Sequence, residues 1–381
     1  MIKLKTTLAL FILSIAFVSC KKDDSSDKDF TNKEILNDFS INVAQGTYND
    51  LNEKANLLYN GIDALASNPT STQLEQCRQL WKDSRKAWEQ SEGFLFGPVS
   101  TENIDPRIDT WPVDYNSLDS VLNSSAIFDD AYINSLDDAL KGFHPIEYLL
   151  WGNNGTKTTA EFTPRQFEYL KALAANLKNL SQELSNSWAP GAYHDVFTEA
   201  GNGSAEYSTE QAAFLEMVSG MAAICEEVAD GKINDPFTAQ DASLEESPFS
   251  GNSITDFTNN IISVENVYSG KYITQGKSLE DFVKFYNLSL DSDIKLKINN
   301  AKSALQSITV PFGQAIFTQQ TQVTNAQQAI NDLRSVLEND LTISKATHSV
   351  VKTNKFSILA GIVTVVALLH SCRKSRAAFR I

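Results

Sequence analysis

Apolar side chains recur at helical intervals along most of this 381-residue chain. Residues three and four positions apart share one face of a helix, so this spacing predicts amphipathic helices. The predicted helices cover residues 35–66, 72–94, 162–188, 209–228, 261–267, 279–308 and 318–337. Alternation with a period of two, which a half-buried strand requires, does not persist for long anywhere. The pattern therefore predicts an all-α fold of two packed helical-bundle halves.

Changes in composition divide the chain into five predicted segments. A lipoprotein signal peptide covers residues 1–20, and a polar tether covers residues 21–34. The N-terminal helical half spans residues 35–157, and the C-terminal helical half spans residues 158–345. A tail with a short apolar run occupies residues 346–381. The hydrophobic share of 42% and the aromatic share of 10% are large enough for a packed core and argue against a disordered chain.

The first twenty residues have the pattern of an export signal. Lys3 and Lys5 precede the apolar residues 8–17, and Val18-Ser19-Cys20 follows them. A cysteine directly after a short apolar core and a small residue resembles a bacterial lipoprotein cleavage box. The resemblance implies that Cys20 becomes an acylated N-terminus, which attaches the chain to the cell envelope, at the outer membrane with a periplasmic or surface face. An ordinary signal peptide with a chance cysteine is the alternative.

The tail contains a second apolar run, over residues 356–369. Its fourteen residues fall short of the roughly 20 that a membrane-spanning helix needs. Cys372 follows the run, so the tail repeats the arrangement of the first twenty residues. Two interpretations stay open: the leader of a neighbouring lipoprotein joined by a frameshift or a lost stop, and a genuine C-terminal hydrophobic anchor.

The charge of the chain is negative and uneven. The formal net charge is −15, and the last thirty residues carry six Lys and Arg but no acid, so the body is more acidic than the whole. An acidic body repels nucleic acid and anionic lipid and favours cations or basic ligands. We therefore expect no nucleic-acid partner. The body cysteines, Cys77 and Cys225, lie in helical patterns and are interpreted as small core residues.

Residues 142–152 carry the most distinctive chemistry. Pro145 suits the first turn of a short helix, which puts His144 at its cap and Glu147 on the same side three residues later. An imidazole and a carboxylate on one face could hold a cation or share a proton. A buried His–Glu hydrogen bond that supports a helix corner explains this segment equally well.

Two further carboxylates and several absences narrow the chemistry. Glu92 lies in an aromatic, glycine-rich turn, and Asp109 lies in an irregular acidic loop. His194 is interpreted as a surface or capping residue. The chain has no His-Glu-x-x-His, no CxxC pair, no Gly-x-Ser-x-Gly and no phosphate-binding glycine loop. One imidazole among carboxylates is an oxygen-rich set, which suits iron, manganese, calcium or magnesium better than structural zinc.

Several of these segments resemble the motifs of the imelysin family. Residues 142–147, Gly-Phe-His-Pro-Ile-Glu, match the family's Gly-x-His-x-x-Glu signature, and the match continues to Gly152. Residues 88–98 look like the family's first motif. Residues 108–112, Ile-Asp-Thr-Trp-Pro, resemble its Trp-Pro loop.

A fourth motif resembles the iron-regulated branch of the same family. It comprises residues 246–253 with Asp256, Asn260 and residues 268–270. The four motifs occur in the family's order and span roughly residues 35–340. The chain departs from the branch at Ser247-Pro248, where a His-Ser-Cys run is frequent, and in its C-terminal ending. The first departure removes potential ligands.

The resemblance implies a two-bundle helical fold with the signature near the junction of the halves. It also implies attachment to the cell envelope, a role linked to iron, and iron-uptake proteins as possible partners. The predicted ligands for iron or another divalent cation are His144, Glu147, Glu92 and Asp109. The predicted pocket residues are Trp111, Ser250, Asn252 and Asp256.

Three functional hypotheses follow. The favoured one is an envelope-anchored lipoprotein that binds iron, another metal or an iron-containing ligand. The second is a metallopeptidase, since the family is classified among peptidases, with Glu147 as general base acting on metal-bound water. The third makes the His144–Glu147 pair architectural and assigns an organic ligand to the cleft. Ser250, Asn252 and Asp256 could also be loop-capping residues under any of the three.

Overall fold

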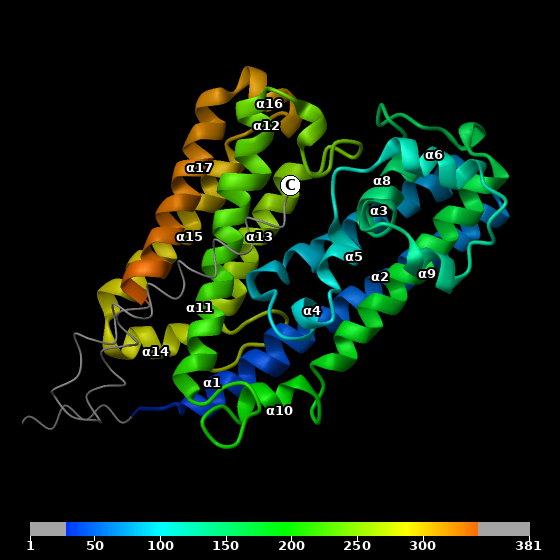
Figure 1. Cartoon of the computed structure of the whole chain (residues 1–381). Helices are drawn as coiled ribbons and strands as arrows, with labels where there is room; N and C mark the ends of the chain where they lie inside the picture. Colours follow the sequence, from blue (N-terminus) through cyan, green and yellow to red (C-terminus); the bar gives the residue numbers. More distant parts are fainter. Residues whose placement is uncertain (1–27, 342–381) are drawn as a thin grey trace, which may run out of the picture.

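Figure 1 shows the computed structural model, which describes residues 28–341. Helices dominate this range and no strand occurs in it, so the predicted all-α fold class is confirmed. The predictions for the signal peptide, Cys20, residues 21–27 of the tether and the tail of residues 346–381 lie outside the described residues. No helix between residues 28 and 341 is long and apolar enough to cross a bilayer.

The first long helical run begins earlier than predicted. The side chain of Thr31 accepts the backbone N–H of Glu34, whose carboxylate accepts the N–H of Thr31, and this capping box starts the helix inside the predicted tether. The run continues without a break to Ser67, and Asn68, which precedes Pro69, is its C-cap. Its parts are α1 (Asn32–Asp38), the π-helical segment Phe39–Gln45 and α2 (Gly46–Ser67).

The first group of helices forms around α2. Helices α3 (Ser71–Glu89) and α9 (Pro164–Ser187) pack along α2, and α8 (Phe143–Trp151) packs against both. By packing, α9 therefore belongs with this group, although the predicted boundary after residue 157 assigns it to the other half. The shorter helices of the group are α4 (Pro98–Thr101), α5 (Asp105–Asp109), α6 (Tyr115–Asn123), α7 (Asp130–Ser135) and α10 (Tyr193–Thr198).

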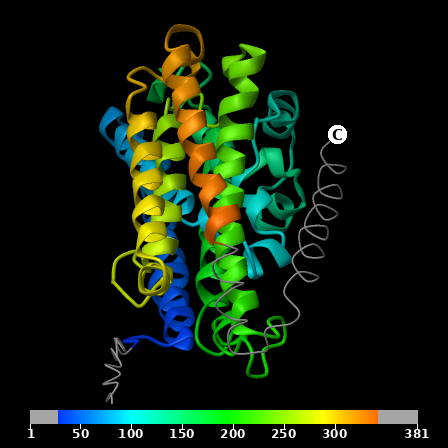
Figure 2. The same ribbon diagram turned by 90° about the vertical axis from the view of Figure 1, so that its left-hand side faces the viewer.

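The second group contains four long helices that pack against one another. Figure 2 shows the long helices of this part of the chain running side by side. The predicted helix over residues 279–308 is interrupted at Asn287, whose side chain accepts the N–H of Leu290 and starts a new helix. The long helices are α11 (Glu210–Glu226), α13 (Ser253–Ser269), α15 (Leu288–Gln306) and α17 (Gln320–Ser335). The short ones are α12 (Asn234–Ala239), α14 (Leu279–Tyr286) and α16 (Phe312–Thr318).

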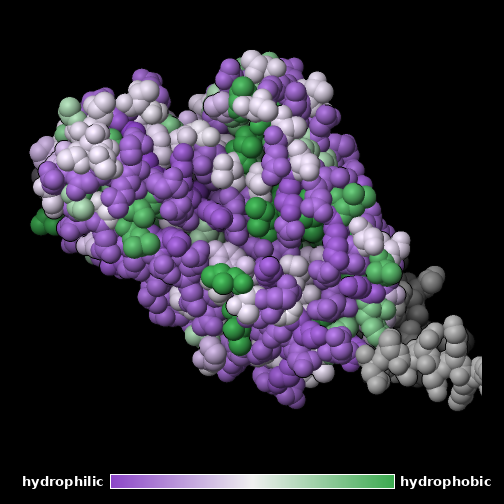
Figure 3. Space-filling view, turned by 180° about the vertical axis from the view of Figure 1, so that it is seen from behind, coloured by the Kyte–Doolittle hydropathy of each residue, from purple (hydrophilic) through white to green (hydrophobic). Residues whose placement is uncertain are grey.

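The two groups meet where the backbone after α3 passes between α11 and α13. The 3-10 turn η2 (Glu92–Phe94) contacts both helices. The N–H of Gly93 donates to Ser263 Oγ at 2.8 Å, and a Cβ on Gly220 would lie only 2.6 Å from the Gly93 carbonyl oxygen. Seen from behind, the surface is mostly hydrophilic with scattered hydrophobic side chains (Figure 3). Most apolar side chains thus point into a core that continues across the junction.

Candidate metal centre

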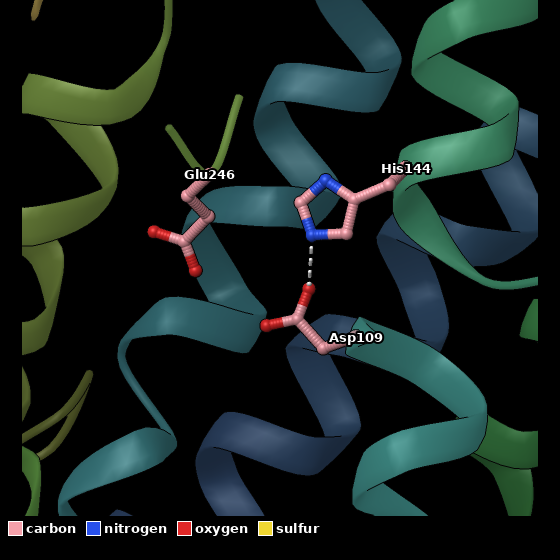
Figure 4. Close-up of side chains that lie close together, drawn as sticks. All are labelled: Asp109, His144 and Glu246. Atoms are coloured by element: carbon pink, nitrogen blue, oxygen red, sulfur yellow. Dashed lines mark hydrogen bonds and ion pairs between the residues drawn. The ribbon is translucent and has the colours of Figure 1, made fainter. Parts of the chain in front are cut away.

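A glycine at the start of α8 sets the position of His144. Gly142 has a φ of +81°, and a Cβ there would overlap the carbonyl oxygen of Ile108 in α5. The two helix ends can approach this closely because residue 142 has no side chain. Ile108 precedes Asp109, so the approach brings His144 Nε2 to 3.0 Å from Asp109 Oδ1 (Figure 4).

Asp109 contacts three donors. Its Oδ1 forms an ion pair with Arg85 as well as the contact with His144, and its Oδ2 accepts a hydrogen bond from Trp88 Nε1 at 2.7 Å. Burial opposes ionisation, but the Arg85 guanidinium and the His144 ring hold the pKa of Asp109 well below its usual range. Asp109 is therefore a carboxylate at neutral pH.

The imidazole of His144 is protonated to the charged form at neutral pH. Burial disfavours a charged imidazole, but the contacts with the carboxylates of Asp109 and Glu147 raise the pKa of His144 to about 9. The ring is therefore an imidazolium at neutral pH unless another cation takes the place of its proton.

Glu246 reaches the same place from the other group of helices. It lies between the 3-10 turn η6 (Ala242–Leu244) and α13, and it is fully buried. Its Oε1 accepts Arg85 Nη2 at 2.8 Å and Lys232 Nζ at 2.6 Å. One ligand atom each from Asp109, His144 and Glu246 lies within 4.8 Å of the other two. Figure 4 shows these three side chains converging from separate segments.

A second group of potential ligands lies beside the first. One carboxylate oxygen each from Glu89, Glu92, Asp109 and Glu246 lies within 4.8 Å of the others. Asn260 Nδ2 donates to Glu89 Oε2 at 2.5 Å and to Glu92 Oε2 at 2.8 Å. Burial, and for Glu92 also the neighbouring Glu89, raises the pKa of both glutamates well above the usual range. The two groups share Asp109 and Glu246.

The predicted ligand Glu147 lies next to His144 but in neither of these groups. Its Oε2 is 3.7 Å from His144 Nδ1. Its Oε1 accepts the backbone N–H of Ser250 at 2.7 Å and the Ser250 hydroxyl at 2.6 Å. Glu147 therefore connects the loop of Ser250 to the His144 side of the site.

Other predicted pocket residues lie around the two groups of potential ligands. The Trp111 ring centroid lies 6.1 Å from the His144 ring centroid and 5.4 Å from Lys232 Nζ. Asp256 Oδ1 accepts Asn252 Nδ2 at 2.7 Å and lies 3.7 Å from Arg85 Nε. Burial raises the pKa of Asp256 to about 7.

A small cavity lies between the ligand group of Asp109, His144 and Glu246 and the loop that contains Trp111. Its volume is about 10 Å³, which is room for about one water molecule. Its lining combines polar and aromatic side chains from both groups of helices, including Trp111, Tyr115, His144, Glu246 and Phe249.

The donor atoms fit a metal ion. His144 Nδ1, Glu147 Oε2 and Glu246 Oε2 are buried and have no hydrogen-bond partner among the described residues. Most buried polar atoms have partners, so such atoms mark a place for a ligand, a proton or a water. His144 Nε2 and Asp109 Oδ1 lie 3.0 Å apart, within hydrogen-bond distance, and this is also the separation of two octahedral ligands at right angles that are each bound at about 2.1 Å.

Internal cations neutralise part of the acidic charge. Arg85 and Lys232, both fully buried, contact the acidic cluster that the two ligand groups form together. These two charges and the imidazolium of His144 do not neutralise the six carboxyl groups around them, so further protons or a metal ion must balance the rest. A metal ion that binds here displaces those protons. The six carboxyl groups are Glu89, Glu92, Asp109, Glu147, Glu246 and Asp256.

Arg85, Lys232 and Glu246 are not among the ligand and pocket residues predicted from the sequence. The sequence does carry a signal for Arg85, because it lies four residues after Trp81 and three before Trp88 on the apolar face of α3. Lys232 likewise continues the buried stripe of Cys225 and Val228. A charged residue on an apolar stripe needs a buried partner of opposite charge.

Comparison with known proteins agrees with the family resemblance of the sequence motifs. The family model described as Imelysin matches residues 44–339. Iron-regulated protein A of Synechococcus elongatus is 30% identical over 317 residues, which cover 81% of this chain and 85% of that protein.

Two solved structures resemble the fold. A protein described as an iron-regulated protein A precursor, from Parabacteroides distasonis, aligns with a TM-score of 0.75 and 28% identity, over 82% of this chain and 94% of its own. An imelysin-like protein from Psychrobacter arcticum aligns with a TM-score of 0.69 and 12% identity, over 83% and 97% of the two chains. The second likeness concerns the fold alone.

Proposed function

Because this chain belongs to the imelysin family, we propose that it is an iron-linked binding protein that holds a metal cation at Asp109, His144 and Glu246. The observation that carries the proposal is the convergence of these three buried ligand atoms within 4.8 Å. Carboxylates held this close together repel one another unless a cation or protons lie between them.

Iron is the metal we favour. The donor set has one imidazole among carboxylates, and such a set suits iron or manganese better than structural zinc. The relatives from Synechococcus elongatus and Parabacteroides distasonis are both named as iron-regulated proteins. A bound metal ion would supply the positive charge that protons otherwise provide. Arg85 would orient Asp109 and Glu246, and Trp88 would hold the second oxygen of Asp109.

The metallopeptidase alternative has less support from the geometry. Glu147 would have to act as general base, but its Oε1 accepts two hydrogen bonds from Ser250, and its Oε2 is buried 3.7 Å from the ring of His144. The cavity beside His144 holds about 10 Å³, which a single water fills, and a peptide bond with its neighbouring side chains needs far more room. A binding role requires neither a free base nor a substrate cleft.

Binding measurements on the purified full chain test the proposal. Titration with Fe²⁺ without oxygen, and with Mn²⁺ as a redox-stable probe, should give one bound ion in calorimetry. Replacing two ligands, His144→Ala with Glu246→Gln, should weaken binding at least about 100-fold, since even outer-shell partners are worth 10- to 100-fold.

His194→Ala is the matched control for the binding test. His194 also pairs with an aspartate, Asp195 at 2.7 Å, but it lies outside the cluster. Its loss should leave the affinity unchanged. Equal binding by the double variant and the wild-type chain would show that the ion binds elsewhere.

We also propose that the chain is attached to the cell envelope through an acylated Cys20 and acts there with iron-uptake proteins. The support is the arrangement of Lys3, Lys5, residues 8–17 and Cys20. In cells fed radioactive palmitate, Cys20→Ser should lose the label and leave the membrane fraction. Cys372→Ser is the matched control, because Cys372 also follows an apolar run. A label retained in Cys20→Ser would contradict the anchor.

A further inference from the structure

A buried lysine enters the cluster from the continuation of α11. After Glu226 the helix becomes the π-helical segment Glu227–Ile233, and Lys232 lies near its end with a fully buried side chain. A π turn contains an extra residue, which rotates the residues after it by roughly 100°. The Lys232 side chain faces the acidic side chains of Glu92 and Glu246.

The ammonium group of Lys232 is surrounded by carboxylate oxygens. Its Nζ lies 2.6 Å from Glu246 Oε1, 2.8 Å from Glu92 Oε2 and 3.6 Å from Glu89 Oε2. These three acids belong to the group of four carboxylates whose oxygens lie within 4.8 Å of one another. The lysine thus contacts its neighbours as a small cation would.

Unpartnered oxygens point to a cation position rather than a chance acidic cluster. Asn260 donates its amide N–H groups to Glu89 and Glu92, while its Oδ1 has no hydrogen-bond partner within the described part of the chain. Glu246 Oε2 is equally buried and unpartnered. Carboxylate oxygens are the ligands that hard divalent and trivalent cations prefer, and the Asn260 amide N–H groups hold two of these carboxylates in place.

We propose that Lys232 occupies a second cation position, formed by Glu89, Glu92, Asp109 and Glu246 with Asn260 beside it. This position shares Asp109 and Glu246 with the metal site of the proposed function, on which the inference rests. Two cations joined by shared carboxylates could lie here, but the lysine side chain supplies one of them. The chain therefore binds one metal ion where the same acidic groups would accept two.

Metal content per chain tests the inference. The purified full chain, saturated with Mn²⁺ and freed of unbound ion, is measured by elemental analysis, and the free ligand sites are titrated by calorimetry. The wild-type chain should hold one ion, and Lys232→Met should hold two. The rise in Tm on addition of Mn²⁺ should also be larger in the variant, since the ion replaces a lost internal charge.

Two further variants complete the test. Lys232→Gln keeps a polar side chain of similar length, so it reports the same gain if Lys232→Met does not fold. Lys157→Met is the matched control, because Lys157 is a half-buried lysine that donates to the Leu149 carbonyl and to Gln166 instead of the cluster, and its loss should leave the count at one.

The two proposals fail in different ways. A wild-type chain without bound ion contradicts the proposed function. A variant at Lys232 that folds and binds no more ions than the wild-type chain overturns the second cation position, whatever the wild-type count. A gain of one ion in either Lys232 variant supports it.

Discussion

Arg85 lies among acids that would otherwise repel one another. Its guanidinium pairs with Glu89 at 2.6 Å and with Glu246 at 2.8 Å, and it also pairs with Asp109. None of these side chains reaches solvent to any useful extent. Water therefore screens neither the attraction nor the repulsion, and the loss of one partner leaves buried charges uncompensated.

Replacing this arginine should cost far more stability than replacing one at the surface. We expect Arg85→Met to lower the free energy of unfolding by about 3–5 kcal/mol at pH 7, since the remaining carboxylates lose their partner. Arg334→Met, which removes the half-buried pair with Asp230, should cost less than about 1 kcal/mol. Urea unfolding measures both. A loss below about 1 kcal/mol in Arg85→Met would contradict the network.

Glu245 makes the stability of the fold depend on pH, in the direction opposite to that of a salt-bridged acid. Burial raises its pKa to about 7, although Ser253 and the N–H of Gly313 donate to its Oε2. A raised folded pKa means that the folded chain binds the proton more tightly, so stability falls as the pH rises from about 4.5 to 7. Glu245→Gln should remove up to about 3 kcal/mol of this fall.

Urea unfolding of the wild-type chain and the Glu245→Gln variant between pH 4.5 and pH 8 checks this prediction. The difference between the two chains should favour the variant increasingly as the pH rises. Glu265→Gln, a half-exposed acid paired with Lys302, is the control. A constant difference across the pH range would show that Glu245 titrates as it does in the unfolded chain.

At the scale of elements, the site depends on how closely α8 approaches α5. The approach requires Gly142, which combines a positive φ with direct contact to the Ile108 carbonyl. A side chain there would displace the start of α8 and, with it, His144. The glycine of the Gly-x-His-x-x-Glu signature, Gly142, thus has a structural role that is separate from metal binding.

Gly142→Ala should therefore reduce both stability and metal affinity. Gly191→Ala is the matched control, because Gly191 has a φ of +89° but a Cβ added there would meet no atom of the described residues within 4 Å. The control should lose about 1–2 kcal/mol for the backbone conformation alone. Gly142→Ala should lose more and should bind Mn²⁺ more weakly in calorimetry, whereas an equal loss in both variants would mean that the overlap is relieved without moving α8.

The helices could be predicted from the sequence because each buries one apolar stripe. The stripes of the continuous run from α1 to α2 and those of α3, α9 and α17 gave boundaries within a few residues of those observed. The interruption at Asn287 was missed because the apolar spacing continues across it, while a single side-chain hydrogen bond starts the new helix. The partnership of α9 with α2 was also missed, since amphipathic spacing shows that a face is buried but not against which helix.

The site was predictable only in part, because many of its contacts join different helices. Motifs identified Asp109, His144 and Glu147, which lie near one another along the chain and meet through α5 and α8. Arg85, Lys232 and Glu246 come from three distant segments, and their pairing exists only after the two helical groups pack. Sequence spacing reports neighbours on one helix, whereas these contacts join different helices.

At the scale of the molecule, the acidic cluster lies where the two groups of helices meet. Asp109 and His144 come from the first group, while Asn260 and the π-helical segment of Lys232 belong to the second. Hydrogen bonds from Asn260 to Glu89 and Glu92 cross the junction. A cation bound between Asp109, His144 and Glu246 would therefore link both groups at once.

This position predicts that metal binding stabilises both groups together and weakens in acid. Ion at about 100 times its Kd should add about 2.7 kcal/mol, and hydrogen exchange should slow in α8 and at the start of α13 alike. The effect should shrink from pH 7.5 to pH 5, because His144, with a pKa of about 9, and the glutamates with raised pKa must release protons to the incoming ion.

Hydrogen-exchange mass spectrometry with and without Mn²⁺ measures this coupling. Glu246→Gln should confine any protection to α5 and α8, since the variant removes the ligand that precedes α13. Protection of α8 alone in the wild-type chain would mean that the first group binds the ion unaided. Simultaneous protection of both helices, lost in Glu246→Gln, is the outcome expected of an ion that the two groups of helices hold jointly, because the variant removes only the ligand that the second group supplies.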